Sequence, residues 1–78
     1  MFNARYTFVF KNKPTQTNFQ DIAGEVIWDT VFEYSPNAAY TQSFTDDSVT
    51  LVFEQGDLAP RIRFDLHKKL ADLAEEFA

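Results

Sequence analysis

The most distinctive chemistry in this chain lies in four carboxylates spaced four positions apart: Asp21, Glu25, Asp29 and Glu33. On a helix, side chains four residues apart share one face, so these four form a single acidic stripe. From residue 14 to residue 60 the chain has eight Asp and Glu residues and no Lys, Arg or His. A surface of one charge favours binding to a basic partner, and it specifies no reaction.

The acidic stripe is unfavourable for the helix that carries it. Each like-charge pair at i and i+4 costs about 0.2–0.5 kcal/mol, and the stripe has three such pairs. Asp21 near the helix start is favoured by the macrodipole, whereas Glu33 near the end is disfavoured by it. The alternative interpretation is a solvated acidic face that only aids solubility.

Two large aromatic residues, Trp28 and Phe32, fall beside the acidic stripe and opposite the apolar face of the predicted helix. If they are exposed, they supply the apolar anchor that protein interfaces need, while the charges give orientation. The alternative is that a chain end, the C-terminal helix or a second subunit covers them. Trp28 could also lie over the bare backbone of Gly24, one turn earlier. The predicted partner-binding residues are Asp21, Glu25, Trp28, Asp29, Phe32 and Glu33.

Catalytic and metal-binding patterns are sparse. The chain has one histidine, His67, and no cysteine, so it lacks the ligands of a typical zinc site and an activated thiol. Asp46 and Asp47 with Glu54 or Asp57 do not have the spacing of a calcium loop and are typical of turns. We therefore expect no enzymatic activity, no cofactor and no metal.

Composition predicts one small domain with an aromatic core. The 78 residues include nine Phe, three Tyr and one Trp, and the net charge is −5. The charge is segregated: residues 1–16 carry +3, residues 17–59 carry −8 and residues 60–78 carry 0. Net negative charge argues against direct nucleic-acid binding, which depends on Lys and Arg. No segment has the pattern of a signal peptide or a membrane span, so we expect a cytoplasmic protein.

The elements that position these residues follow from periodicity. Residues 4–11 alternate as a half-buried strand. Thr17 and Gln20 have the spacing of a capping box, which predicts a helix from near Asn18 that ends before Pro36. Its predicted apolar face comprises Phe19, Ile22, Ala23, Val26, Ile27 and Thr30, with Tyr34 continuing it.

The second half of the chain predicts three strands and a helix. Residues 40–44 and 48–54 read as a hairpin around the polar turn 45–47, and a further turn is expected at 55–57. Residues 61–64 alternate again, with Ile62 and Phe64 pointing inward. A helix should then start with Asp65 as its N-cap, although it could begin earlier and absorb part of that strand.

The predicted fold class is therefore α+β, in the order β-α-β-β-β-α, with an antiparallel sheet and both helices on one face. If the first and last strands are neighbours, the open sheet face carries a basic patch. Its members would be Arg5, Lys11, Arg61 and Arg63.

These observations favour a protein-binding module that occludes a basic, nucleic-acid-binding surface of another protein. Successive stripe carboxylates rise about 6 Å along a helix, within a factor of two of the 3.4 Å between phosphates of a DNA strand. In size and acidity, though in no motif, the chain is similar to small phage-borne anti-restriction and anti-CRISPR inhibitors, and no family is assigned. The alternative is a homo-oligomer that associates through Trp28 and Phe32.

Overall fold

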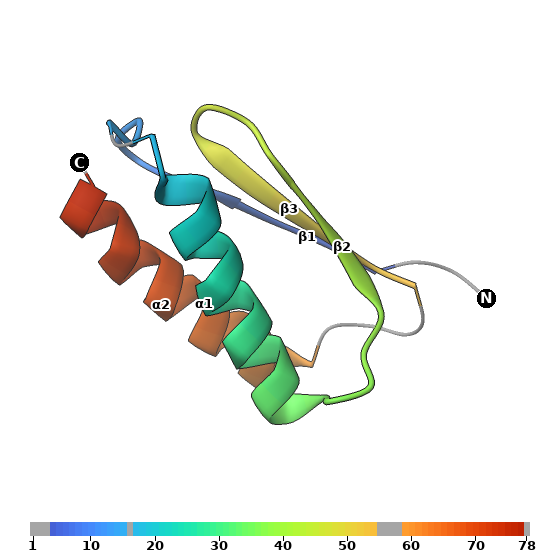
Figure 1. Ribbon diagram of the computed structural model, residues 1–78. Coiled ribbons are helices and arrows are strands. Elements are labelled where there is room, and N and C mark those ends of the chain that lie inside the picture. Colours follow the sequence, from blue (N-terminus) through green and yellow to red (C-terminus); the bar gives the residue numbers. More distant parts are fainter. Residues whose placement is uncertain (1–3, 16, 55–58, 78) are drawn as a thin grey trace.

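The computed structural model describes residues 4–15, 17–54 and 59–77. Within them the chain forms a three-stranded antiparallel sheet with two helices packed together on one face (Figure 1). The elements are β1 (Ala4–Val9), α1 (Phe19–Tyr34), β2 (Tyr40–Phe44), β3 (Ser48–Phe53) and α2 (Pro60–Phe77). The predicted α+β class, the antiparallel sheet and the placement of the helices are confirmed.

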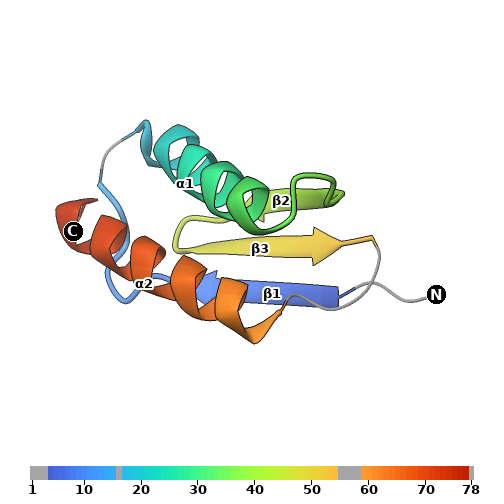
Figure 2. The same cartoon turned by 90° about the horizontal axis from the view of Figure 1, so that it is seen from below.

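The strand order, β1-β3-β2, puts the last strand in the middle of the sheet. Both β1 and β2 pair antiparallel with β3, so they run parallel to each other at opposite edges. α1 makes the connection between these two edges, as in a split β-α-β unit. Figure 2 shows the result: α1 runs along β2, and α2 runs along β1.

The core lies between the helices and the inward face of the sheet, as the alternation along β1 and β3 predicts. Its fully buried large side chains include Leu51 from the sheet and Ile27, Leu66 and Leu70 from the helices. The buried hydroxyl of Thr30 is satisfied, because it donates to the Val26 carbonyl and lies 3.3 Å from Lys69 Nζ. A set of edge-on aromatic contacts closes one end of the core: Phe8–Phe10, Phe10–Phe19, Phe19–Phe44 and Phe19–Phe77.

The start of α1 differs from the prediction in one detail. The helix begins after Asn18, as expected, but the capping box of Thr17 and Gln20 is not formed. Asn18 is the N-cap, and its side chain makes no capping hydrogen bond. The helix ends at Tyr34, directly before Ser35 and Pro36, as proline's steric effect on the preceding residue predicts.

The strand predicted at residues 61–64 is wrong, because this segment forms the first turns of α2. Ile62 is buried, whereas Phe64, expected to point inward, is 75% exposed. Asp65 is not an N-cap. It lies inside α2, accepts a hydrogen bond from the Tyr34 hydroxyl at 3.0 Å and pairs with Lys69 at 3.7 Å.

The basic patch predicted on the open sheet face is also wrong, because Arg61 and Arg63 belong to α2. That face instead carries Arg5 among hydroxyl and β-branched side chains. Thr7 and Thr50 are register partners there, with their hydroxyl oxygens 3.2 Å apart. The turn expected at 55–57 lies outside the described residues. Among the residues that are described, no helix is long and apolar enough to cross a membrane.

Candidate protein-binding surface

The outer face of α1 carries two stacked aromatic rings. Trp28 and Phe32 are 57% and 51% exposed, so the structure resolves the question that the sequence left open. Their ring centroids lie 6.0 Å apart with 24° between the planes. Residues four apart on a helix meet in this way, while Ile27 and Val31, each one position earlier, point into the core.

Two further aromatic rings, on the helix-facing side of the sheet, follow the exposed pair. Trp28 lies 6.5 Å from Tyr40 of β2, and Tyr40 stacks on Phe53 of β3 at 5.4 Å. Burial raises the pKa of the Tyr40 hydroxyl from its usual 10.0. We call Phe32, Trp28, Tyr40 and Phe53 the aromatic row. Because Phe53 is a buried core residue, the row connects the exposed rings to the core.

A shallow depression of about 750 Å³ lies between α1 and β2, and Trp28 is one of the residues that line it. Two stripe carboxylates, Asp21 and Glu25, lie on its α1 wall. Gln42 and Phe44 form the β2 wall, and both follow from the alternation of β2, whose residues 40, 42 and 44 share the face that meets the helices. The structure therefore brings Asp21, Glu25 and Trp28 around one depression.

Gly24 leaves room on α1 for the end of the Gln42 side chain from β2. A Cβ built at this position would lie 3.0 Å from Gln42 Nε2. The side chain lying over the bare backbone is therefore that of Gln42, the position that the sequence suggested for Trp28. Trp28 turns instead toward Phe32 and Tyr40.

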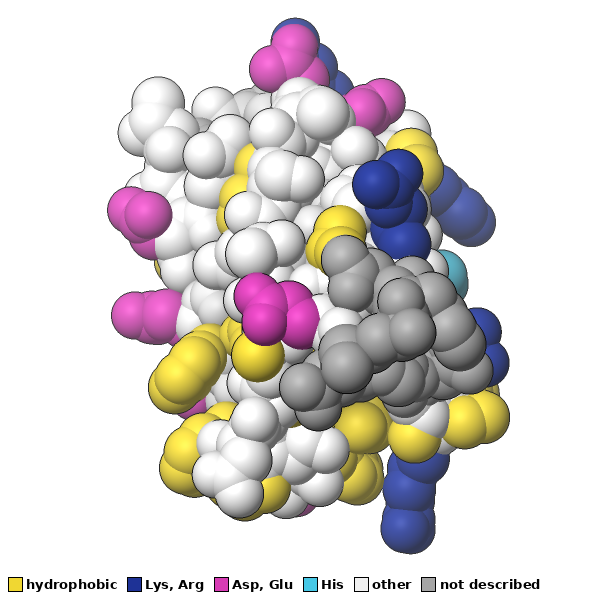
Figure 3. All heavy atoms as spheres, turned by 90° about the vertical axis from the view of Figure 1, so that its right-hand side faces the viewer, with side chains coloured by type: hydrophobic (Ala, Val, Ile, Leu, Met, Phe, Trp, Pro, Cys, Tyr) yellow, Lys and Arg dark blue, Asp and Glu magenta, His cyan; other side chains and the backbone are white. Residues whose placement is uncertain are grey.

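Asp29 and Glu33 are exposed on α1 but outside the depression. All four carboxylates of the acidic stripe are exposed, and neither of the two ion pairs between described residues involves them. On the face drawn in Figure 3, acidic side chains lie along the left margin, near the centre and at the top, and Lys, Arg and His side chains lie mainly along the right margin.

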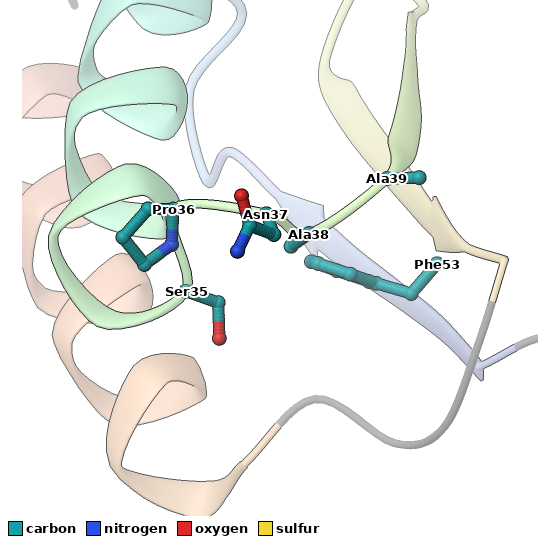
Figure 4. A pocket seen from close by; sticks show the side chains of 6 residues that line it. All are labelled: Ser35, Pro36, Asn37, Ala38, Ala39 and Phe53. Carbon is teal, nitrogen blue, oxygen red and sulfur yellow. The ribbon is translucent and has the colours of Figure 1, made fainter.

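A second hollow of about 440 Å³ lies after the end of α1 (Figure 4). The ring of Phe53 extends toward Ala38, and the polar side chains of Ser35 and Asn37 lie nearby. None of the described residues that line it has an acidic or basic side chain. The lining residues are Ser35, Pro36, Asn37, Ala38, Ala39 and Phe53.

Within the described residues, no group of three or more His, Cys, Asp or Glu side chains is arranged to hold a metal ion. No protein-family model, curated protein or solved structure matches the chain. The candidate surface is therefore defined by its own geometry and charge.

Sequence reasoning missed the contribution of β2 to this surface. Tyr40, Gln42 and Phe44 alternate along one strand, which was a usable signal for a shared face. Their position beside α1 depends on the strand order, and no local pattern carries that information.

Proposed function

We propose that this protein is a non-enzymatic binding module whose α1 face docks on a basic surface of another protein. The observation that carries the proposal is the exposed, stacked pair Trp28 and Phe32 beside uncompensated carboxylates. Interfaces gain most of their affinity from a few aromatic and arginine anchors, and charged rims contribute orientation and association rate. Trp28 with Phe32 supplies the anchor, and the acidic stripe supplies the rim.

The aromatic row favours binding because it holds the anchor in place before the partner arrives. Ordering a mobile side chain at an interface costs about 0.5–1.5 kcal/mol. Contact with Tyr40, itself stacked on the buried Phe53, limits the conformations open to Trp28. The free-energy cost of ordering the Trp28 side chain when the partner binds is therefore smaller.

The partner surface that fits best is one built for nucleic acid. Such surfaces present Lys and Arg to phosphates along a strand. The stripe offers four carboxylates on one helix face, and covering a nucleic-acid site with it would exclude the nucleic acid. We infer inhibition by occlusion, in the cytoplasm, without direct contact between this protein and nucleic acid.

The decisive experiment is competition with nucleic acid. Candidate nucleic-acid-binding proteins are mixed with labelled DNA or RNA, and displacement by this protein is followed by fluorescence polarisation. The double variant Glu25→Lys with Asp29→Lys should lose displacement. The control double variant Asp72→Lys with Glu76→Lys changes the net charge equally at exposed positions of α2 and should retain it. Equal loss in both would mean that only net charge matters, and unchanged displacement in the stripe variant would refute the proposal.

A second candidate function is self-association through the same aromatic pair. It is favoured by one observation, the apolar area that Trp28 and Phe32 leave exposed. In this case a second copy covers the rings and the acids form a solvated rim. Sedimentation of the wild type and of Trp28→Ala at high concentration distinguishes the two, because a monomeric wild type eliminates the homo-oligomer.

A further inference from the structure

A second groove lies on the opposite side of the molecule, between β1 and α2. In Figure 2, α2 crosses β1 so that its first turns extend past the free edge of that strand. Two hollows follow this groove, of about 530 and 350 Å³, and His67 lines both. Tyr6 lines the first and Phe8 the second. We call this feature the β1–α2 groove.

The free edge of β1 has backbone groups available for a new strand. Phe10 N–H donates to the Asp47 carbonyl at 2.6 Å, which continues the β1–β3 register by one step. Hydrogen-bonded positions alternate along an antiparallel strand. Arg5, Thr7 and Val9 therefore direct their backbone N–H and C=O away from β3. None of these groups bonds to a described residue outside the sheet.

The spacing of the two hollows matches the spacing of side chains on an added strand. Tyr6 and Phe8 are two residues apart on β1, which is about 7 Å. A strand paired to β1 would place side chains i and i+2 at the same interval on the same face. One apolar side chain would enter the hollow beside Phe64, and the next would enter the hollow floored by Ala71 and Ala74.

His67 divides the two hollows and is fixed from two sides. Its Nδ1 lies 3.2 Å from the Tyr6 hydroxyl, and its ring meets the ring of Phe8 edge-on at 4.8 Å. Burial raises the pKa of the Tyr6 hydroxyl, and the nearby Arg63 opposes that rise. The contacts with Tyr6 and Phe8 therefore hold the His67 side chain between the two hollows before any segment binds.

The charge of the groove selects the kind of strand. Arg63 and Lys68 border the first hollow and Lys11 the second, whereas Glu75 is the one carboxylate among the described lining residues. None of these basic side chains takes part in the ion pairs between described residues. Arg5 adds positive charge on the outer face of β1.

We propose that the β1–α2 groove binds an extended acidic segment of another protein, which pairs with β1 as a fourth strand. The segment has apolar residues at alternate positions and Asp or Glu between or beside them. Strand addition derives affinity from main-chain hydrogen bonds and specificity from pockets for alternate side chains. This surface is separate from the acidic stripe, so the protein has two binding faces of opposite charge.

The probe for the test is a fluorescein-labelled peptide of about nine residues, long enough to follow β1, with Val at two central alternate positions and Glu at all others. Some Glu side chains then share the face of the Val side chains and lie beside the hollows, and the others face Arg5. A peptide of the same length with Lys in place of every Glu is the charge control. The acidic peptide should bind at least about tenfold more tightly than the basic one. In proton–nitrogen correlation spectra it should shift the amide signals of Arg5, Thr7, Val9 and His67.

Two sets of variants separate backbone pairing from charge. Thr7→Pro removes one outward N–H of β1, a position where an edge strand tolerates proline. It should weaken binding at least about tenfold, whereas Gln42→Pro, the equivalent change at the free edge of β2, should leave affinity within about twofold. The second variant, Arg63→Glu with Lys68→Glu, changes exposed positions of α2 and should also weaken binding about tenfold. It still tests the proposal if Thr7→Pro fails to fold.

The competing outcomes are distinct. No binding, preference for the basic peptide, or shifts confined to β2 would each overturn the proposal. Self-association that is abolished by Arg63→Glu with Lys68→Glu would assign the groove to a second copy and would also overturn it. Glu25→Lys with Asp29→Lys should not change peptide affinity, so the result is independent of the function proposed for the acidic stripe.

Discussion

The ring of Trp28 on α1 lies 6.5 Å from the ring of Tyr40 on β2, with 36° between the two planes. This contact joins the exposed aromatic pair to the sheet. Trp28 is also the one tryptophan of the chain, so intrinsic fluorescence reports on this position alone.

Tyr40→Ala should loosen Trp28 without unfolding the protein. We expect faster acrylamide quenching of Trp28 and a loss of about 1–3 kcal/mol in the free energy of unfolding, because a half-buried ring is removed. A double-mutant cycle with Trp28→Ala should give a coupling of about 0.5–1.5 kcal/mol, typical of aromatic pairs. Zero coupling would show that Tyr40 does not hold Trp28.

Asp29→Lys should stabilise the protein while impairing its proposed function. It replaces two like-charge pairs, with Glu25 and Glu33, by two opposite-charge pairs worth about 0.2–0.5 kcal/mol each. We expect the free energy of unfolding in urea to rise by up to about 2 kcal/mol, and Asp29→Asn to give about half of this gain. A destabilised Asp29→Lys would mean that Asp29 makes a favourable contact in the free protein.

Gly24→Ala tests how the helix and β2 approach each other. Alanine favours a helix interior over glycine by about 1 kcal/mol. The new Cβ meets only the flexible end of Gln42 within 4 Å, which can move aside. We expect the free energy of unfolding, measured by heat or urea, to rise by about 0.5–1 kcal/mol. The increase should be largest in the Gln42→Ala background, where the side chain next to the new Cβ has been removed. A net loss in that background would place the steric conflict in the backbone.

Ile62→Ala and Phe64→Ala form a matched pair in the first turns of α2. Ile62 is 6% exposed, so its truncation should cost about 2–4 kcal/mol of unfolding free energy. Phe64 is 75% exposed, so its truncation should cost less than about 0.5 kcal/mol. If this segment were a strand with both side chains inward, the two losses would be similar.

The stability of the protein should fall at alkaline pH. Burial raises the folded-state pKa of Tyr40 above 10.0, the value expected in the unfolded chain. Below that pH the hydroxyl is protonated in both states, and its contribution is fully present. Above it the unfolded chain loses the proton first, so the free energy of unfolding decreases as pH rises toward the folded-state pKa. Tyr40→Phe should show a smaller decrease above about pH 10 in urea titrations, and an identical slope would contradict the assignment.

The predictable parts of this fold are those encoded by local periodicity. Phe8 in β1, Phe10 directly after it, and Val49 and Leu51 in β3 are buried as their alternation indicates. The prediction of a strand at residues 61–64 was wrong because four alternating residues are too few to exclude a helix. Ile62 is also four residues before Leu66, which is the spacing of a buried helical face.

The candidate surface was only half predictable for a different reason. The acidic stripe and the positions of Trp28 and Phe32 on the outer face of α1 follow from helical spacing. Their contact with Tyr40 requires β2 to lie beside α1, and this depends on β3 entering between β1 and β2. Strand order arises from contacts far apart in sequence, and local patterns do not contain it.

The central position of β3 also has a consequence during synthesis. Among the described residues, β1 and β2 each pair only with β3, so they have no sheet neighbour until residues 48–53 have left the ribosome. Until then the emerged chain has two unpaired strands, and α1 lacks its packing partner α2. We expect the domain to fold in one late step rather than from the N-terminus onward, so the emerged chain is exposed to aggregation while residues 48–53 are still inside the ribosome.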